Sequence, residues 1–135
     1  MVFKHSFEMR GTNRVRNQLR TLAAVDPDIT DPVLGNHARS ERRRLKSTPY
    51  PAKLPGQKYV RTGNLANRFS ARRVKKGVWR VENSATYSVW VIKRGMQNRQ
   101  YHRGRWWTME DILEDGMPDL TRDLSHALEQ KLDSQ

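Results

Sequence analysis

The sequence has no cysteine and no long apolar run. The absence of cysteine excludes a disulfide scaffold, a zinc site with cysteine ligands and a thiol nucleophile. No apolar segment approaches the roughly 20 residues of a membrane-spanning helix. Lys4, His5 and Glu8 stand where a signal peptide would have its apolar centre. We therefore expect a single domain that is made in the cytoplasm and folds without a disulfide or a metal.

Acidic residues are also scarce over most of the chain. Residues 1–108 hold 24 Lys and Arg against 6 Asp and Glu, whereas residues 109–135 hold 2 against 8, and the formal net charge is +12. A basic body can attract a polyanion such as nucleic acid. The acidic end of one copy can also meet the basic body of the next, in head-to-tail self-association. A solvated surface that keeps the protein soluble is the third interpretation.

The apolar spacing predicts an α+β domain. Residues 4–25 carry apolar positions three to four apart and are predicted as a helix that ends at Asp26-Pro27-Asp28. A second helix is predicted from Asp31-Pro32, with Thr30 or Asp31 as its cap, to about Ser47. We divide the chain into a helical part (1–47), an extended proline-rich arm (48–65), a small antiparallel β-meander (66–93), a loop (94–107) and a C-terminal helical part (108–133).

Within the meander, residues 68–75, 77–83 and 86–93 are predicted as three strands. Lys76-Gly77 fits a tight turn between the first two. Thr108 is expected to cap a short helix with Glu110 and Asp111 in its first turn, which Gly116 ends. Pro118 is expected to begin the last helix.

Catalytic patterns are weak in this sequence. The four histidines are isolated, so no metal ligand set is expected. The paired carboxylates Glu110-Asp111 and Glu114-Asp115 lie in a predicted short helix, where dipole compensation and solvation are their expected roles. We expect no catalytic residue, no cofactor and no small-molecule substrate. The one enzyme class kept as an alternative is a small ribonuclease toxin, with His102 beside Tyr101 and Arg103 as the site to test.

Basic residues give a second alternative, a nonspecific nucleic-acid-binding module. Its contacts would be with phosphates, because no base-reading motif is present. The residues that would face DNA are Arg42, Arg43, Arg44, Arg72, Arg73, Lys75 and Lys76. Among the large aromatics, Trp79 is expected in the core. Trp90 and one of Trp106 and Trp107 are expected at an interface and away from the core, since interfaces favour tryptophan.

Four segments of the sequence together resemble a known protein family. Tyr59-Val60-Arg61-Thr62-Gly63-Asn64-Leu65, followed by a short strand pair and Val81-Glu82-Asn83-Ser84-Ala85-Thr86-Tyr87-Ser88-Val89-Trp90-Val91, resembles the head–tail joining (tail-completion) proteins of long-tailed bacteriophages. Tyr50-Pro51-x-x-Leu54-Pro55-Gly56 and Gly104-Arg105-Trp106-Trp107-Thr108 are also similar to that family. Ser88 stands where the family usually has Ala, and Ile92-Lys93-Arg94-Gly95-Met96 stands where a Glu-x-Gly-Thr segment often follows.

The resemblance implies a non-enzymatic subunit of a homo-oligomeric ring in the phage neck, located in the virion at the head–tail junction. Its implied partners are other neck and tail proteins (a portal-side connector, a tail terminator or the tail tube) and DNA by nonspecific proximity, with no membrane. Candidate subunit-interface residues are Tyr59, Arg61, Thr62, Gly63, Asn64, Leu65, Trp90, Trp106, Glu110, Asp111, Glu114 and Asp115. The arm 48–65 is expected to dock on a neighbouring subunit, or to form an internal strap over the meander.

Overall fold

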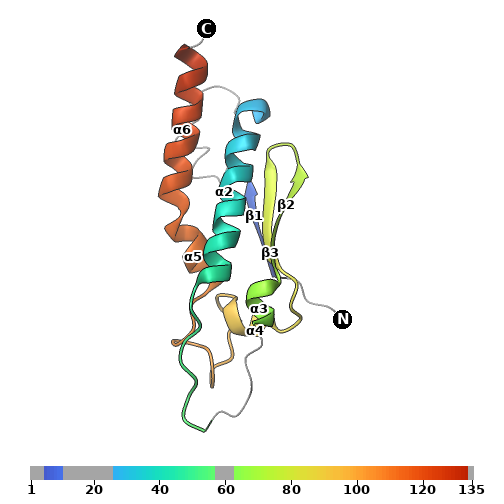
Figure 1. The fold of residues 1–135 in the computed structure, drawn as a ribbon, viewed down its shortest axis with the longest axis vertical. Coiled ribbons are helices and arrows are strands. Elements are labelled where there is room, and N and C mark those ends of the chain that lie inside the picture. The colour runs from blue at the N-terminus through green and yellow to red at the C-terminus, as the bar shows by residue number, and fades with distance from the viewer. Residues whose placement is uncertain (1–4, 11–25, 57–62, 134–135) are drawn as a thin grey trace.

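The protein is a small α+β domain in which one long helix separates a second helix from a sheet. The computed structural model describes residues 5–10, 26–56 and 63–133. Helix α2 (Pro27–Ser47) lies between α6 (Met117–Asp133) and the sheet (Figure 1). The other elements are β1 (His5–Arg10), α3 (Asn64–Asn67), β2 (Phe69–Lys75), β3 (Val78–Asn83), α4 (Ser88–Ile92) and α5 (Met109–Asp115).

The described sheet has three antiparallel strands in the order β1-β3-β2. Its third strand comes from the N-terminus, where His5 pairs with Asn83 and Arg10 with Val78. The helix predicted over residues 4–25 is therefore wrong for 5–10, and residues 11–25 lie outside the described part. In 5–10, Phe7 and Met9 alternate with polar residues, a period of two that favours a strand.

The strand predicted over 86–93 is also wrong, because residues 88–92 form the short helix α4. Ser88, Val89, Val91 and Ile92 are buried while Trp90 is exposed. Burial at positions i, i+1, i+3 and i+4 is a helical spacing, which a strand with alternating faces cannot produce. The edge of β3 that a third meander strand would have used is occupied by β1.

Helix α2 begins earlier than predicted. Its N-cap is Asp26, whose Oδ1 accepts a hydrogen bond from Asp28 N at 2.9 Å, and Pro27 takes the first helical position. Pro32 lies inside the helix. Asp31 has a different role from the predicted cap, since its Oδ1 accepts hydrogen bonds from Gly77 N at 2.7 Å and Trp79 Nε1 at 3.2 Å. Asp31 thus joins α2 to the hairpin.

Several local predictions are confirmed. Lys76 and Gly77 form the turn between β2 and β3, and Gly77 has a φ of 82°. Thr108 caps α5 by accepting a hydrogen bond from Asp111 N at 3.1 Å, and Gly116 ends that helix. Pro118 lies one residue inside α6. Residues 48–56 of the arm contain neither helix nor strand, as their prolines predict.

Trp79 connects the two parts of the core. One apolar cluster fills the space between α2, α5 and the sheet, and the other joins Leu34 to Leu120, Leu124 and Leu128 of α6. Trp79 packs against both clusters. Its indole lies so close to Gly35 that a Cβ there would stand 2.7 Å from Trp79 Cζ2. The Arg39 guanidinium lies 5.2 Å from the centre of the indole ring.

Candidate functional site

The first part of the arm is fastened to its own chain. The Tyr50 and Trp106 rings lie 5.1 Å apart, and the Tyr50 hydroxyl accepts a hydrogen bond from Ala66 N at 2.8 Å. Trp107 Nε1 donates to Pro49 O at 3.1 Å, and Arg105 donates to Ala52 O at 2.6 Å. These contacts are those of an internal strap for residues 49–52.

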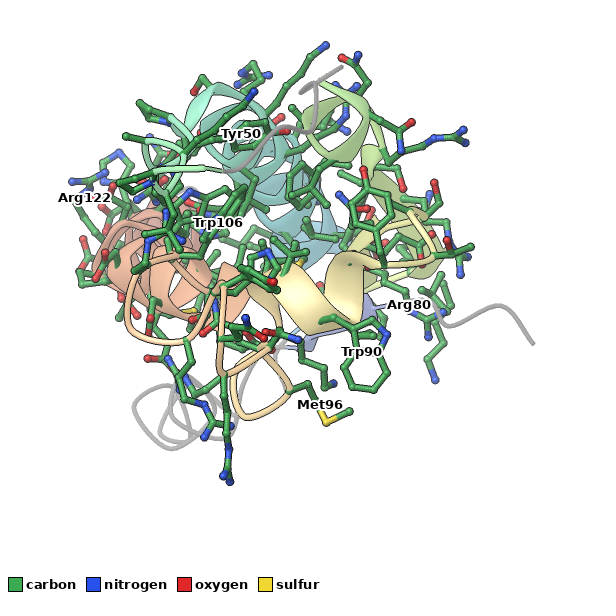
Figure 2. The ribbon with its side chains drawn as sticks, turned by 90° about the horizontal axis from the view of Figure 1, so that it is seen from below. Tyr50, Arg80, Trp90, Met96, Trp106 and Arg122 are labelled. Atoms are coloured by element: carbon green, nitrogen blue, oxygen red, sulfur yellow. The ribbon has the colours of Figure 1, made fainter. Side chains whose placement is uncertain are left out.

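Trp106 and Trp107 both pack on the core, which corrects the expectation that one would point away from it. They are adjacent in sequence but share the cluster, with ring centres 6.2 Å apart, because the chain bends between them and the arm covers both. Trp106 therefore has neighbours within its own chain, where an interface had been predicted. Figure 2 shows Tyr50 and Trp106 near each other.

The turn at Gly63 and the segment around Asn83 form one hydrogen-bonded unit. Gly63 has a φ of 75° and precedes α3, a conformation that favours glycine. Asn83, which is fully buried, donates to Leu65 O at 2.8 Å and accepts from Ala85 N at 2.9 Å. Asn64 Nδ2 lies 3.0 Å from the Tyr87 hydroxyl. The described part of the first sequence pattern, Gly63–Leu65, thus meets the second pattern in space.

Leu65 lies in the core of its own chain and not on the surface that an interface needs. Its side chain is only 4% exposed. Three other residues of the predicted interface, Tyr59, Arg61 and Thr62, lie outside the described residues.

Trp90 is the most exposed large apolar side chain of the described residues. Its exposed fraction is 47%, and those of Tyr87 and Met96 are both 41%. Tyr87 and Trp90 are three residues apart across the first turn of α4, so they lie on one side of it. In Figure 2, Trp90 and Met96 project outward on the same side of the view. We name Tyr87, Trp90 and Met96 the aromatic patch.

Three of the four acidic residues predicted at an interface surround Arg94 of their own chain. The Arg94 guanidinium bonds both carboxylate oxygens of Glu114, at 2.8 and 2.9 Å, and one oxygen of Asp111. Its backbone N donates to Glu110 at 3.0 Å. The Arg94 hydrogen bonds lower the pKa of Glu114, and those of Thr108 and Arg94 lower the pKa of Asp111. This arrangement fixes the loop after α4 to α5.

Most of the basic residues predicted to face DNA have contacts within the chain. Arg42 Nε donates to Phe69 O at 3.0 Å, and Arg72 Nε donates to Glu82 at 2.9 Å. Arg44 pairs with Glu41, Arg73 with Asp31 and Lys76 with Asp28. Arg43 and Lys75 are exposed. Five of the seven residues therefore have an acceptor within the chain, although Arg44, Arg72, Arg73 and Lys76 are exposed as well.

A polar groove between α2 and α6 was not anticipated from the sequence. It has a volume of about 400 Å³ and is lined by Asn36, His37, Ser40, Glu41, Arg44, Asp115, Asp119, Arg122 and Asp123. His37 and Glu41 are buried, with exposed fractions of 7% and 2%. Burial lowers the pKa of His37, against an opposing effect of Asp123 and Asp119, and burial raises the pKa of Glu41. The only sequence signal was the spacing of His37, Glu41 and Arg44 along one side of a predicted helix.

His102 packs among aromatic rings. Its ring centre lies 5.5 Å from that of Trp106 and 6.4 Å from that of Tyr101, both edge to face. Burial, followed by the charge of Arg105, lowers its pKa. The ribonuclease alternative relies on basic side chains beside this single histidine. Arg103, predicted next to it, is exposed.

No group of three or more His, Cys, Asp and Glu residues within 5–10, 26–56 and 63–133 could hold a metal ion. In the same ranges, none of the helices combines the length and apolar character needed to cross a membrane. Comparisons of the chain with protein-family models, with curated proteins and with solved structures find no match.

Proposed function

We propose that this chain is a structural subunit of a bacteriophage neck, which assembles into a ring around the DNA channel between head and tail. The observation that carries the proposal is the unit formed by Gly63–Leu65 and Asn83–Tyr87. Those two segments are the ones that resemble the tail-completion family, and Asn83 and Asn64 join them by hydrogen bonds. A motif whose parts support one another in the fold is stronger support than two short patterns considered separately.

The aromatic patch supports a role in assembly. Interfaces are enriched in tryptophan, tyrosine and methionine. Trp90 has an exposed tyrosine, Tyr87, and an exposed methionine, Met96, close to it in the chain. The patch follows directly from the Asn83 unit, because α4 begins one residue after Tyr87. The same unit that carries the resemblance therefore presents the surface through which a ring could form.

Sedimentation velocity of the purified full chain tests the proposal. The chain is expected to form a discrete oligomer at micromolar concentration, and Trp90→Ser is expected to reduce assembly while circular dichroism stays unchanged. Val74→Ser is the matched control, because Val74 is also an exposed apolar residue, at 41%, but lies on the hairpin, outside the patch. A monomer at every concentration and salt, alone and with added neck proteins, contradicts the proposal.

A nonspecific nucleic-acid-binding module remains the alternative, and the same preparation can test it. Binding of that kind weakens steeply with salt and should be visible at about 50 mM salt. The intrachain pairing of Arg44, Arg72 and Arg73 weighs against it, since each pair must open or be shared before those cations can neutralise a phosphate.

A further inference from the structure

The groove between α2 and α6 has an excess of negative charge in a strongly basic protein. Four carboxylates line it (Glu41, Asp115, Asp119 and Asp123), against the two guanidinium groups of Arg44 and Arg122. The chain as a whole has a formal net charge of +12. A local reversal of sign on this scale attracts positively charged partners and repels DNA.

The two cations of the groove are already engaged. Arg44 bonds both oxygens of Glu41, at 2.8 and 3.0 Å. Arg122 lies 3.2 Å from Asp119 and 3.4 Å from Asp123. Asp115 lines the groove and is exposed. The carboxylates of the groove can therefore accept further hydrogen bonds after these internal pairs have formed, because each carboxylate can accept several.

His37 gives an independent sign of a missing donor. Its side chain is more than nine-tenths buried, it lines the groove, and its Nε2 has no hydrogen-bond partner among the described residues. The nearest charged atom recorded for it, Glu41 Oε1, is 3.8 Å away, too far for a hydrogen bond. Burial favours the neutral ring, in which Nε2 becomes an acceptor when the proton is on Nδ1.

We infer that the α2/α6 groove receives an arginine side chain from a second copy of this chain. A guanidinium group carries five N–H donors in a planar fork, which suits a groove with a histidine acceptor and a carboxylate on α2 and further carboxylates on α5 and α6. Residues 1–108, with 24 Lys and Arg against 6 Asp and Glu, supply such a side chain in every copy. The contact is heterologous, as a ring requires. This inference rests on the proposed function and gives its ring one defined contact.

Charge substitutions at Asp115 test the inference without replacing a buried side chain. Asp115→Asn removes one acceptor charge at the rim, and Asp115→Lys reverses it. We expect the apparent Kd of self-association to rise about tenfold for Asp115→Asn, the effect of losing one charge-assisted hydrogen bond, and further for Asp115→Lys. Glu129→Lys is the matched control, because Glu129 is an exposed carboxylate on α6 that does not line the groove.

The outcomes separate this inference from the proposed function. Weaker assembly of both Asp115 variants, with Glu129→Lys unchanged and thermal stability retained, supports the groove contact. If the wild type assembles and the Asp115 variants assemble equally well, or if Glu129→Lys weakens assembly as much, the groove contact is wrong while the ring remains. If the wild type never assembles, the proposed function itself is overturned.

Discussion

Replacing Gly35 with alanine should destabilise the protein, although alanine is the better helix former. In the interior of a helix the change from glycine to alanine stabilises by about 1 kcal/mol. Here the new Cβ would stand 2.7 Å from Cζ2 and 3.0 Å from Cε2 of Trp79. Forcing an extra methyl group into a packed site costs about 1–3 kcal/mol.

The indole of Trp79 has little room to move away. Its Nε1 is hydrogen-bonded to Asp31 at 3.2 Å, and its ring packs against both apolar clusters. A shift that relieves the overlap with Gly35 would lengthen that bond or disturb the clusters. We therefore expect the cost of the overlap to lie near the upper end of the range of about 1–3 kcal/mol. After the helix gain of about 1 kcal/mol is subtracted, the free energy of unfolding should fall by about 1–2 kcal/mol.

Urea unfolding followed by circular dichroism measures this loss. A Trp79→Leu background supplies the control, because a smaller, flexible side chain removes the ring atoms that the Cβ would meet. In that background Gly35→Ala should be neutral or stabilising, and the difference between the two backgrounds is the coupling energy. The reasoning is refuted if Gly35→Ala stabilises the wild type, or if its effect is the same in both backgrounds.

Three further outcomes are expected. Gly63→Val should lower the free energy of unfolding by about 1–2 kcal/mol in a thermal melt, since its φ of 75° strains a β-branched residue; an unchanged melt with lost assembly would instead assign the turn to docking. Asn83→Ala should lower the free energy of unfolding in urea by about 2–4 kcal/mol, because it leaves the Leu65 carbonyl and the Ala85 N–H without their hydrogen-bond partner. Burial lowers the pKa of His37 below its usual 6.5, so the unfolded chain binds the proton first and stability falls as pH drops below about 6.5. His37→Gln should reduce that fall relative to the exposed control His126→Gln, and equal pH profiles would contradict the shift.

Features set by neighbouring residues were predictable from the sequence. The cap at Thr108 and the turn at Lys76-Gly77 depend on a side chain or a backbone angle within a few residues, and both are where the pattern placed them. The α+β class followed from the same local signals. The start of α2 was misjudged because Asp26-Pro27 and Asp31-Pro32 are equally good local starts, and only the contact of Asp31 with the hairpin decides between them.

Features set by distant residues were not predictable in the same way. The alternation in residues 5–10 is short, and the helical spacing of the following leucines outweighed it. What makes this segment a strand is β3, far along the chain. The contacts of Arg94 with α5 and the groove at His37 likewise join residues with no fixed relation in sequence. Charge counts indicated an acidic end and a basic body, but they did not show which carboxylates form ion pairs within the chain.

The pairing of β1 with β3 has a consequence for the order in which the protein forms during synthesis. His5 and Asn83 are roughly 80 residues apart. At a translation rate of about 5–20 residues per second, the N-terminal strand waits roughly 4–16 s before its partner exists. During that time the β2–β3 hairpin has not yet formed, and residues 5–10 have no partner strand, a condition in which an edge can associate with other chains. A nascent chain stalled before Asn83 is therefore expected to need a chaperone, whereas one that has passed it can close the sheet by itself.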